Sequence, residues 1–118
     1  MKYISINGRE YSKEELDKDI TGSEKFKNIK LGEKFLFFRK GLKTYYISYE
    51  SLKCAFRRIM VVPAGKREIQ VDYLVIADKR KELAVIQVAG HNIAAAVMEK
   101  LKIKAPNASF VCSDRLKR

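Results

Sequence analysis

From residue 33 onward the chain alternates dense apolar runs with short polar turns, and this order limits the possible folds more than any other feature. The runs are rich in aromatic and β-branched residues and are bounded by glycine, proline or charged residues; they cover residues 35–38, 43–49, 55–62, 68–77 and 83–88. Runs of this length and composition are typical of β-strands joined by turns. We therefore predict five antiparallel strands, the third of them ending before Pro63 because proline cannot continue a ladder.

A single amphipathic helix is expected after the fifth strand. Gly90 breaks that strand, Asn92 can cap a helix, and Pro106 ends it by about residue 104. Apolar side chains recur every four positions on one helical face, at Ile93, Val97 and Leu101. A helix with such a face can cover the open end of a curled sheet. The fold class predicted is α+β, an antiparallel rolled sheet or barrel capped by a C-terminal helix.

Residues 1–32 are expected to form an N-terminal hairpin and helix packed on the main domain. Residues 2–6 alternate in polarity and precede Asn7-Gly8, which favours a tight turn and a return strand near residues 10–11. Ser12 stands three residues before Glu15, a capping-box spacing that predicts a helix over 13–20. Residues 23–32 are interpreted as a connection, 33–105 as the barrel with its helix, and 106–118 as a tail with a short strand at 110–111. All three parts belong to one domain.

The formal net charge is +11, and the excess is concentrated after residue 32. Residues 33–118 carry eighteen Lys or Arg against eight Asp or Glu, while residues 1–32 carry seven against six. Such a field attracts phosphate groups on lipid, nucleic acid or an acidic partner. A solvated basic surface without any anionic ligand is the alternative.

Catalytic, metal and cofactor chemistry have little support in the sequence. His91 is the only histidine, the acidic residues after position 33 are scattered singly, and no glycine-rich phosphate loop is present. Cys54 and Cys112 lack metal-ligand spacing, so reduced thiols are expected. No apolar stretch approaches the roughly 20 residues of a membrane span, and no signal sequence is recognisable. A cytoplasmic protein that is not an enzyme and needs no cofactor is predicted.

The segments KFLFFRKGLKTYYISYESL and GHNIAAAVMEKL, with two hairpin-linked strands between them, resemble the pleckstrin-homology-like superfold. The similarity is to uncharacterised bacterial proteins of that type and covers about residues 33–105. Pleckstrin-homology domains have seven strands in two near-orthogonal sheets, whereas five are counted here, with the N-terminal pair as a possible completion.

The resemblance implies an anion-binding end at the hairpin formed by the first two of these strands. Family members that bind phosphoinositides use basic residues there, although their terminal Lys-x-Arg spacing is absent in this chain. In an up-and-down meander the first and third turns fall at the same end, so cations of both turns are expected to converge. The candidate ligand-binding residues are Lys34, Arg39, Lys40, Lys43, Lys66 and Arg67.

The function predicted is that of a noncatalytic intracellular binding or assembly module. It would recognise a protein segment or an anionic membrane surface through its loops and strand edges, and those edges could also pair with a second copy of the chain. A basic nucleic-acid-binding protein is the alternative, because aromatic and basic residues interleave between positions 35 and 58. Packing of the core is another explanation for the aromatic residues in these strands.

Arg57 and Arg58 point to opposite sheet faces, and one of them is expected to pair with a carboxylate such as Asp72.

Overall fold

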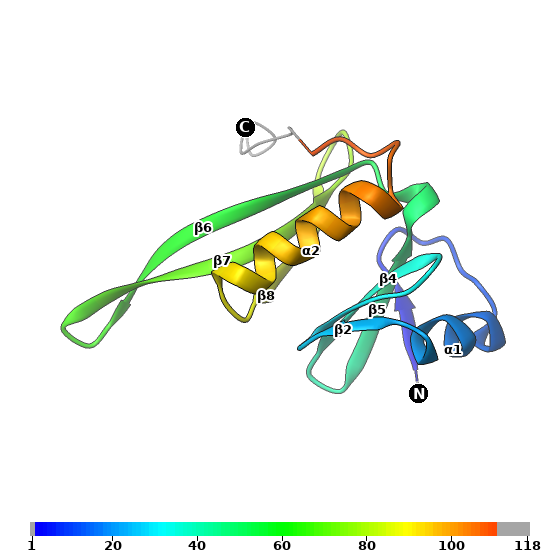
Figure 1. Cartoon of the computed structure of the whole chain (residues 1–118), viewed down its shortest axis with the longest axis horizontal. Coiled ribbons are helices and arrows are strands. Elements are labelled where there is room, and N and C mark those ends of the chain that lie inside the picture. The colour runs from blue at the N-terminus through cyan, green and yellow to red at the C-terminus, as the bar shows by residue number, and fades with distance from the viewer. Residues whose placement is uncertain (1, 111–118) are drawn as a thin grey trace.

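The computed structural model describes residues 2–110, which form two β-sheets, two α-helices and one short 3-10 helix. Figure 1 shows the first sheet beside the N-terminus and the second sheet extending away from it along the longest axis of the molecule. The longest helix lies along the second sheet. The α+β class and the β-rich character predicted from the sequence are confirmed.

The first sheet has five strands in the order β1-β5-β4-β3-β2. Their bounds are β1 Tyr3–Ser5, β2 Glu24–Phe26, β3 Ile29–Leu31, β4 Phe35–Lys40 and β5 Lys43–Ser48. β1 is parallel to β5, and the other neighbouring pairs are antiparallel.

The predicted N-terminal hairpin is wrong, because β1 pairs with β5 rather than with residues 10–11. Gly8 does adopt a positive φ of +82°, but the chain after it leads into a helix instead of returning as a strand. Pairing with the long, buried β5 brings the Tyr3 ring against those of Phe37 and Tyr46. A two-residue return strand offers no comparable apolar contact.

The expected connection over residues 23–32 is also wrong, since it contains β2 and β3. Ile29 and Leu31 are fully buried and alternate with the partly exposed Lys30. The turn before them is made by Lys27, whose φ is +63°. Because β3 pairs with β4, the first sheet includes strands from both sides of residue 33.

The second sheet has the order β6-β7-β8 and is antiparallel throughout. Its strands are β6 Cys54–Ala64, β7 Arg67–Ala77 and β8 Glu82–Val88, and η1 Tyr49–Ser51 joins the two sheets. The five strands predicted after residue 33 are therefore confirmed. The expected end of the third strand before Pro63 is wrong, because Pro63 lies opposite Glu68 inside the ladder.

Proline is tolerated at this position because β6 is an edge strand. The amide of Ala55 points away from β7 and donates to the Ser109 carbonyl at 3.0 Å. Every second residue along the strand points the same way, so the missing N–H of Pro63 faces outward and removes no bond to β7.

Two helices cover the sheets. α1 Lys13–Thr21 begins at Ser12, whose hydroxyl accepts the Glu15 amide at 3.2 Å, and this confirms the predicted cap. Leu16 and Ile20 of α1 pack on aromatic residues of the first sheet. α2 His91–Lys104 begins at Gly90 without a side-chain cap, so the capping role expected of Asn92 is wrong.

The main core lies between the two sheets and the apolar face of α2. Leu36 and Ile47 come from the first sheet, Leu74 and Ile76 from the second, and Leu101 from the helix. Within residues 2–110 no ladder joins one sheet to the other, so the barrel is not closed there. In this part of the chain no helix has the length and apolarity required to cross a membrane.

Candidate functional site

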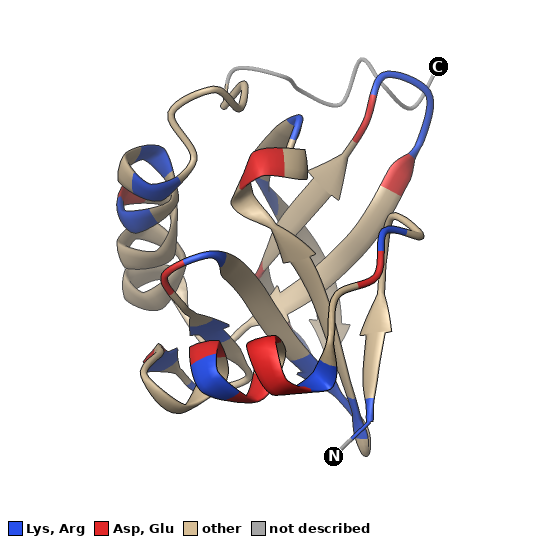
Figure 2. Cartoon of the chain, turned by 90° about the vertical axis from the view of Figure 1, so that its right-hand side faces the viewer, with Lys and Arg blue, Asp and Glu red and all other residues tan. Residues whose placement is uncertain are grey.

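Three of the predicted cations lie on one hairpin, at the turn between β4 and β5. Lys40 is opposite Lys43, and Arg39 is opposite Thr44 in the ladder. The turn between them contains Gly41, which has a φ of +65°, and Leu42, whose side chain is 92% exposed. We call Arg39, Lys40, Leu42 and Lys43 the basic tip. Figure 2 shows Lys and Arg gathered at this end of the first sheet, near the N-terminus.

A pocket of about 250 Å³ opens beside the basic tip. It is lined by Ile20, Lys27, Asn28, Lys30, Phe37, Phe38, Arg39, Leu42 and Thr44. Three of these residues are cationic, and none of the described lining residues carries a carboxylate. The amide of Arg39 donates to the Asn28 carbonyl at 2.8 Å, which holds the β2–β3 turn against the end of β4.

Sequence reasoning missed Lys27 and Lys30 because residues 23–32 were interpreted as a connection. The alternation of Ile29, Lys30 and Leu31 was the available signal, since it indicates a strand with Lys30 on the face opposite its neighbours. The pocket therefore adds two cations to the ligand-binding residues that the sequence predicted.

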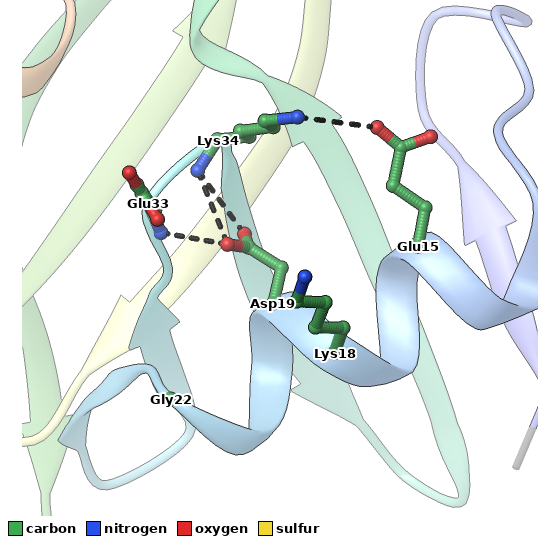
Figure 3. A pocket seen from close by; sticks show the side chains of 6 residues that line it. All are labelled: Glu15, Lys18, Asp19, Gly22, Glu33 and Lys34. Carbon is green, nitrogen blue, oxygen red and sulfur yellow. Dashed lines mark hydrogen bonds and ion pairs between the residues drawn. The ribbon is translucent and has the colours of Figure 1, made fainter.

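Lys34 lies apart from the basic tip, in a second pocket where acidic side chains surround it (Figure 3). Its ammonium is 3.7 Å from the Glu15 carboxylate. Its amide, together with those of Glu33 and Phe35, donates to the carboxylate of Asp19 at 2.8 to 3.3 Å. This arrangement fixes the entry to β4. Because Lys34 is partly neutralised by Glu15, it is a weak candidate for anion binding.

Tyr49 completes the structural network around Asp19. Its hydroxyl donates to the Gly32 carbonyl at 2.9 Å. Burial, followed by the negative charge of Asp19, raises the pKa of Tyr49 well above its ordinary value. The neutral phenol is therefore the form that the fold requires.

Lys66 and Arg67 lie at the β6–β7 turn, which forms one end of the molecule in Figure 1, far from the β4–β5 turn. The expected convergence of both turns is wrong because the two hairpins belong to different sheets that diverge. Neither residue forms an ion pair within residues 2–110. Anion binding by each group of cations stays a prediction.

Arg57, Asp72 and His91 form a polar cluster at the beginning of α2. Arg57 pairs with the buried Asp72 at 2.7 Å, which confirms the pairing predicted for one of the two arginines. His91 Nδ1 lies 2.8 Å from the Arg57 guanidinium and 3.8 Å from Asp72. Arg58 pairs with Glu82 on the opposite face.

This cluster ties the beginning of α2 to β6 and β7 at the strand-to-helix junction. The polar contacts of His91 within the described part of the chain are a cation and a carboxylate, without a hydroxyl or thiol that it could activate. No group of three or more metal-ligating side chains occurs among residues 2–110.

The expectation of reduced thiols is wrong for Cys54, which is disulfide-bonded. Cys112, like the part of the expected tail strand at position 111, lies outside the described residues.

Comparison of the chain with protein-family models, curated proteins and solved structures found no match. The resemblance to the pleckstrin-homology-like superfold therefore remains an expectation.

Proposed function

We propose that this protein is a noncatalytic binding module whose basic tip docks on an anionic membrane surface. The observation that carries the proposal is Leu42, an almost fully exposed leucine placed between cations at the end of a hairpin. Gly41 supplies the positive φ that the tight turn needs, so Leu42 projects from the sheet without backbone strain.

Electrostatic and apolar contributions act together at such a tip. Each Lys or Arg near an anionic leaflet contributes about 1 kcal/mol, and the attraction decreases within a Debye length. Burial of one leucine side chain at the acyl boundary contributes roughly 1.5–3 kcal/mol. Arg39, Lys40 and Lys43 supply the first contribution and Leu42 the second. Lys27 and Lys30 can hold a phosphate in the adjoining pocket.

Nucleic-acid binding is the less favoured function because most aromatic residues at this end are buried, and the partly exposed Tyr45 is already stacked on Phe38. Single-strand binders stack bases on exposed rings, whereas Phe37 and Phe38 next to the pocket face the core. The phenol and benzyl rings of Phe35, Tyr46, Tyr49 and Phe56 are buried as well.

Vesicle cosedimentation tests the proposal. The protein is mixed with phosphatidylcholine vesicles that contain or lack phosphatidylserine, and a parallel series uses single-stranded oligonucleotides. We expect binding to the anionic vesicles that weakens as salt is raised. The triple variant R39Q/K40Q/K43Q should reduce the bound fraction by about tenfold or more, because three phosphate contacts are lost.

The matched control is K79Q/R80Q/K81Q, which removes the same charge from the exposed β7–β8 turn. If both triple variants lost the same fraction of vesicle binding, net charge alone would explain the loss, and the basic tip would be rejected as the docking site. Tighter binding to oligonucleotides than to vesicles would favour the alternative function.

A further inference from the structure

The outer half of the β6–β7 hairpin exposes apolar side chains that the fold leaves uncovered. Ile59, Met60 and Val61 are 50%, 44% and 56% exposed, and Ile69 on the facing strand is 48% exposed. Figure 1 shows this part of the hairpin projecting beyond the beginning of α2. Four of the seven large apolar residues that are exposed within residues 2–110 therefore lie on one short stretch of ribbon.

The exposed residues occupy both faces of the ribbon. Ile59 and Val61 alternate with Met60, so the first two point to one face and the third to the other. Ile69 is opposite Val62 in the ladder and shares the face of Met60. A partner packed on one face would cover only half of these side chains. A strand added at the edge of the sheet would lie beside both sets.

The edge of β6 is suited to such an addition. Because the Ala55 amide points away from β7, the backbone groups of Ile59 and Val61 also point outward. Among residues 2–110 neither of them forms a hydrogen bond to an outer neighbour. This row of outward-pointing backbone amides ends at Pro63, which has no N–H group to donate. An unpaired, apolar edge of this kind is a template for strand pairing.

Charges along the edge define the partner. Residues 59–65 are uncharged. Toward the sheet centre Arg57 and Arg58 are already paired with carboxylates, whereas Lys66 and Arg67 at the turn form no ion pair within the described residues. A segment lying along this edge would therefore meet apolar side chains along most of its length and two free cations at the end nearest the turn.

We propose that the edge of β6 binds an extended peptide of another protein by strand addition. The peptide has alternating apolar residues and acidic residues at the end that reaches the β6–β7 turn. Outward amides and carbonyls of Ile59 and Val61 supply the main-chain bonds, and Lys66 and Arg67 select the acidic end. This surface is separate from the basic tip and does not depend on membrane docking.

A second copy of the chain fits the edge less well. Antiparallel pairing of two β6 strands would place Lys66 and Arg67 of each copy beside Arg57 and Arg58 of the other. The formal charge of +11 on each chain adds to this repulsion. Self-association is therefore an outcome that would contradict the proposal.

Two labelled synthetic peptides serve as probes: Asp-Glu-Val-Thr-Val-Thr-Ile-Thr-Val and the same sequence with Lys-Lys in place of Asp-Glu. Binding is measured by fluorescence anisotropy, and amide protection of Ile59 and Val61 by NMR hydrogen exchange. We expect saturable binding of the acidic peptide, at least about tenfold tighter than that of the basic one, with new protection at both amides.

The variant Val61→Pro removes one outward amide, as Pro63 does naturally, and leaves the bonds to β7 in place. This variant should bind the acidic peptide with an affinity lower by about tenfold or more, while the control Val61→Thr should retain the wild-type affinity. An acidic peptide methylated on its backbone nitrogens tests the same bonds in the unaltered protein and should not bind.

Three results would overturn the proposal. They are equal affinity for both peptides or none for either, full binding by Val61→Pro, and a concentration-dependent dimer of the wild-type protein that Val61→Pro abolishes in sedimentation. Failure here is distinguishable from failure of membrane docking, because Val61→Pro should bind anionic vesicles normally and Leu42→Ser should bind the peptide normally.

Discussion

The carboxylate of Asp19 occupies the space that any side chain at Gly32 would need. A Cβ atom on Gly32 would lie 2.1 Å from Asp19 Oδ2 and 2.6 Å from its Cγ. The same carboxylate accepts three consecutive backbone amides, the last of them from Phe35 at 3.0 Å. Helix α1 is in this way joined to the beginning of β4, the strand that ends at the basic tip.

Gly32→Ala is therefore expected to destabilise the fold by roughly 1–3 kcal/mol, because either the carboxylate or the loop must move. Gly22→Ala is the matched control, since a Cβ there would contact nothing within 4 Å. Chemical denaturation of both variants measures the difference in unfolding free energy. Equal stabilities would show that the Asp19 contact does not constrain residue 32.

Asp19→Asn should be destabilising as well, by roughly 1–3 kcal/mol, because an amide oxygen cannot replace a charged acceptor for three amides. The loss should be reduced in the Gly32→Ala background, where the contact is already disturbed. A double-mutant cycle measures this coupling, and strict additivity would contradict it.

Tyr49 is expected to stabilise the fold up to alkaline pH. Its folded pKa is raised, first by burial and then by Asp19. Its stabilising contribution is present below the ordinary tyrosine pKa of about 10 and is lost as pH rises above it. The pKa of Tyr3 is also raised, first by burial and then by its bond to Asp17. Ultraviolet absorbance during alkaline titration should therefore show late-titrating phenols, with one fewer in Tyr49→Phe than in the wild-type protein. An unchanged titration in Tyr49→Phe would reject the assignment.

Asp78 should order the β7–β8 turn in a pH-dependent way. Its carboxylate accepts the amides of Arg80 and Lys81 at 2.8 and 2.9 Å, and these bonds lower its pKa. The stabilisation of the turn by the ionised carboxylate is present above the ordinary aspartate pKa and is lost as pH falls through the lowered pKa of Asp78. Amide exchange at residues 80 and 81 should therefore lose protection in acid. In Asp78→Asn the protection should not change across this range.

The sequence predicted the second sheet and α2 well because long runs with a regular period carry a strong signal. β7 and the stripe of Ile93, Val97 and Leu101 are examples. β1 was predicted as a strand from the alternation of residues 2–6, but with the wrong partner, whereas β2 and β3, each of three residues, were not predicted. The pairing of β1 with β5 is decided by tertiary contacts that no local pattern encodes.

The candidate site was predicted in part for the same reason. Arg39, Lys40 and Lys43 belong to one hairpin, so their proximity follows from local sequence. Lys27 and Lys30 join them through tertiary pairing of β3 with β4. The position of Lys66 and Arg67 depended on the relative direction of two sheets, which turn order alone does not determine.

The most direct test of membrane docking uses tryptophan, which the natural chain lacks. In Leu42→Trp the indole should shift its emission to shorter wavelength on addition of phosphatidylserine vesicles and should be quenched by brominated acyl chains. The matched control is Ile103→Trp on α2, where the natural side chain is 77% exposed; its emission should not change. An unshifted Trp at position 42 on protein that cosediments with vesicles, or equal shifts at both positions, would contradict docking through the basic tip.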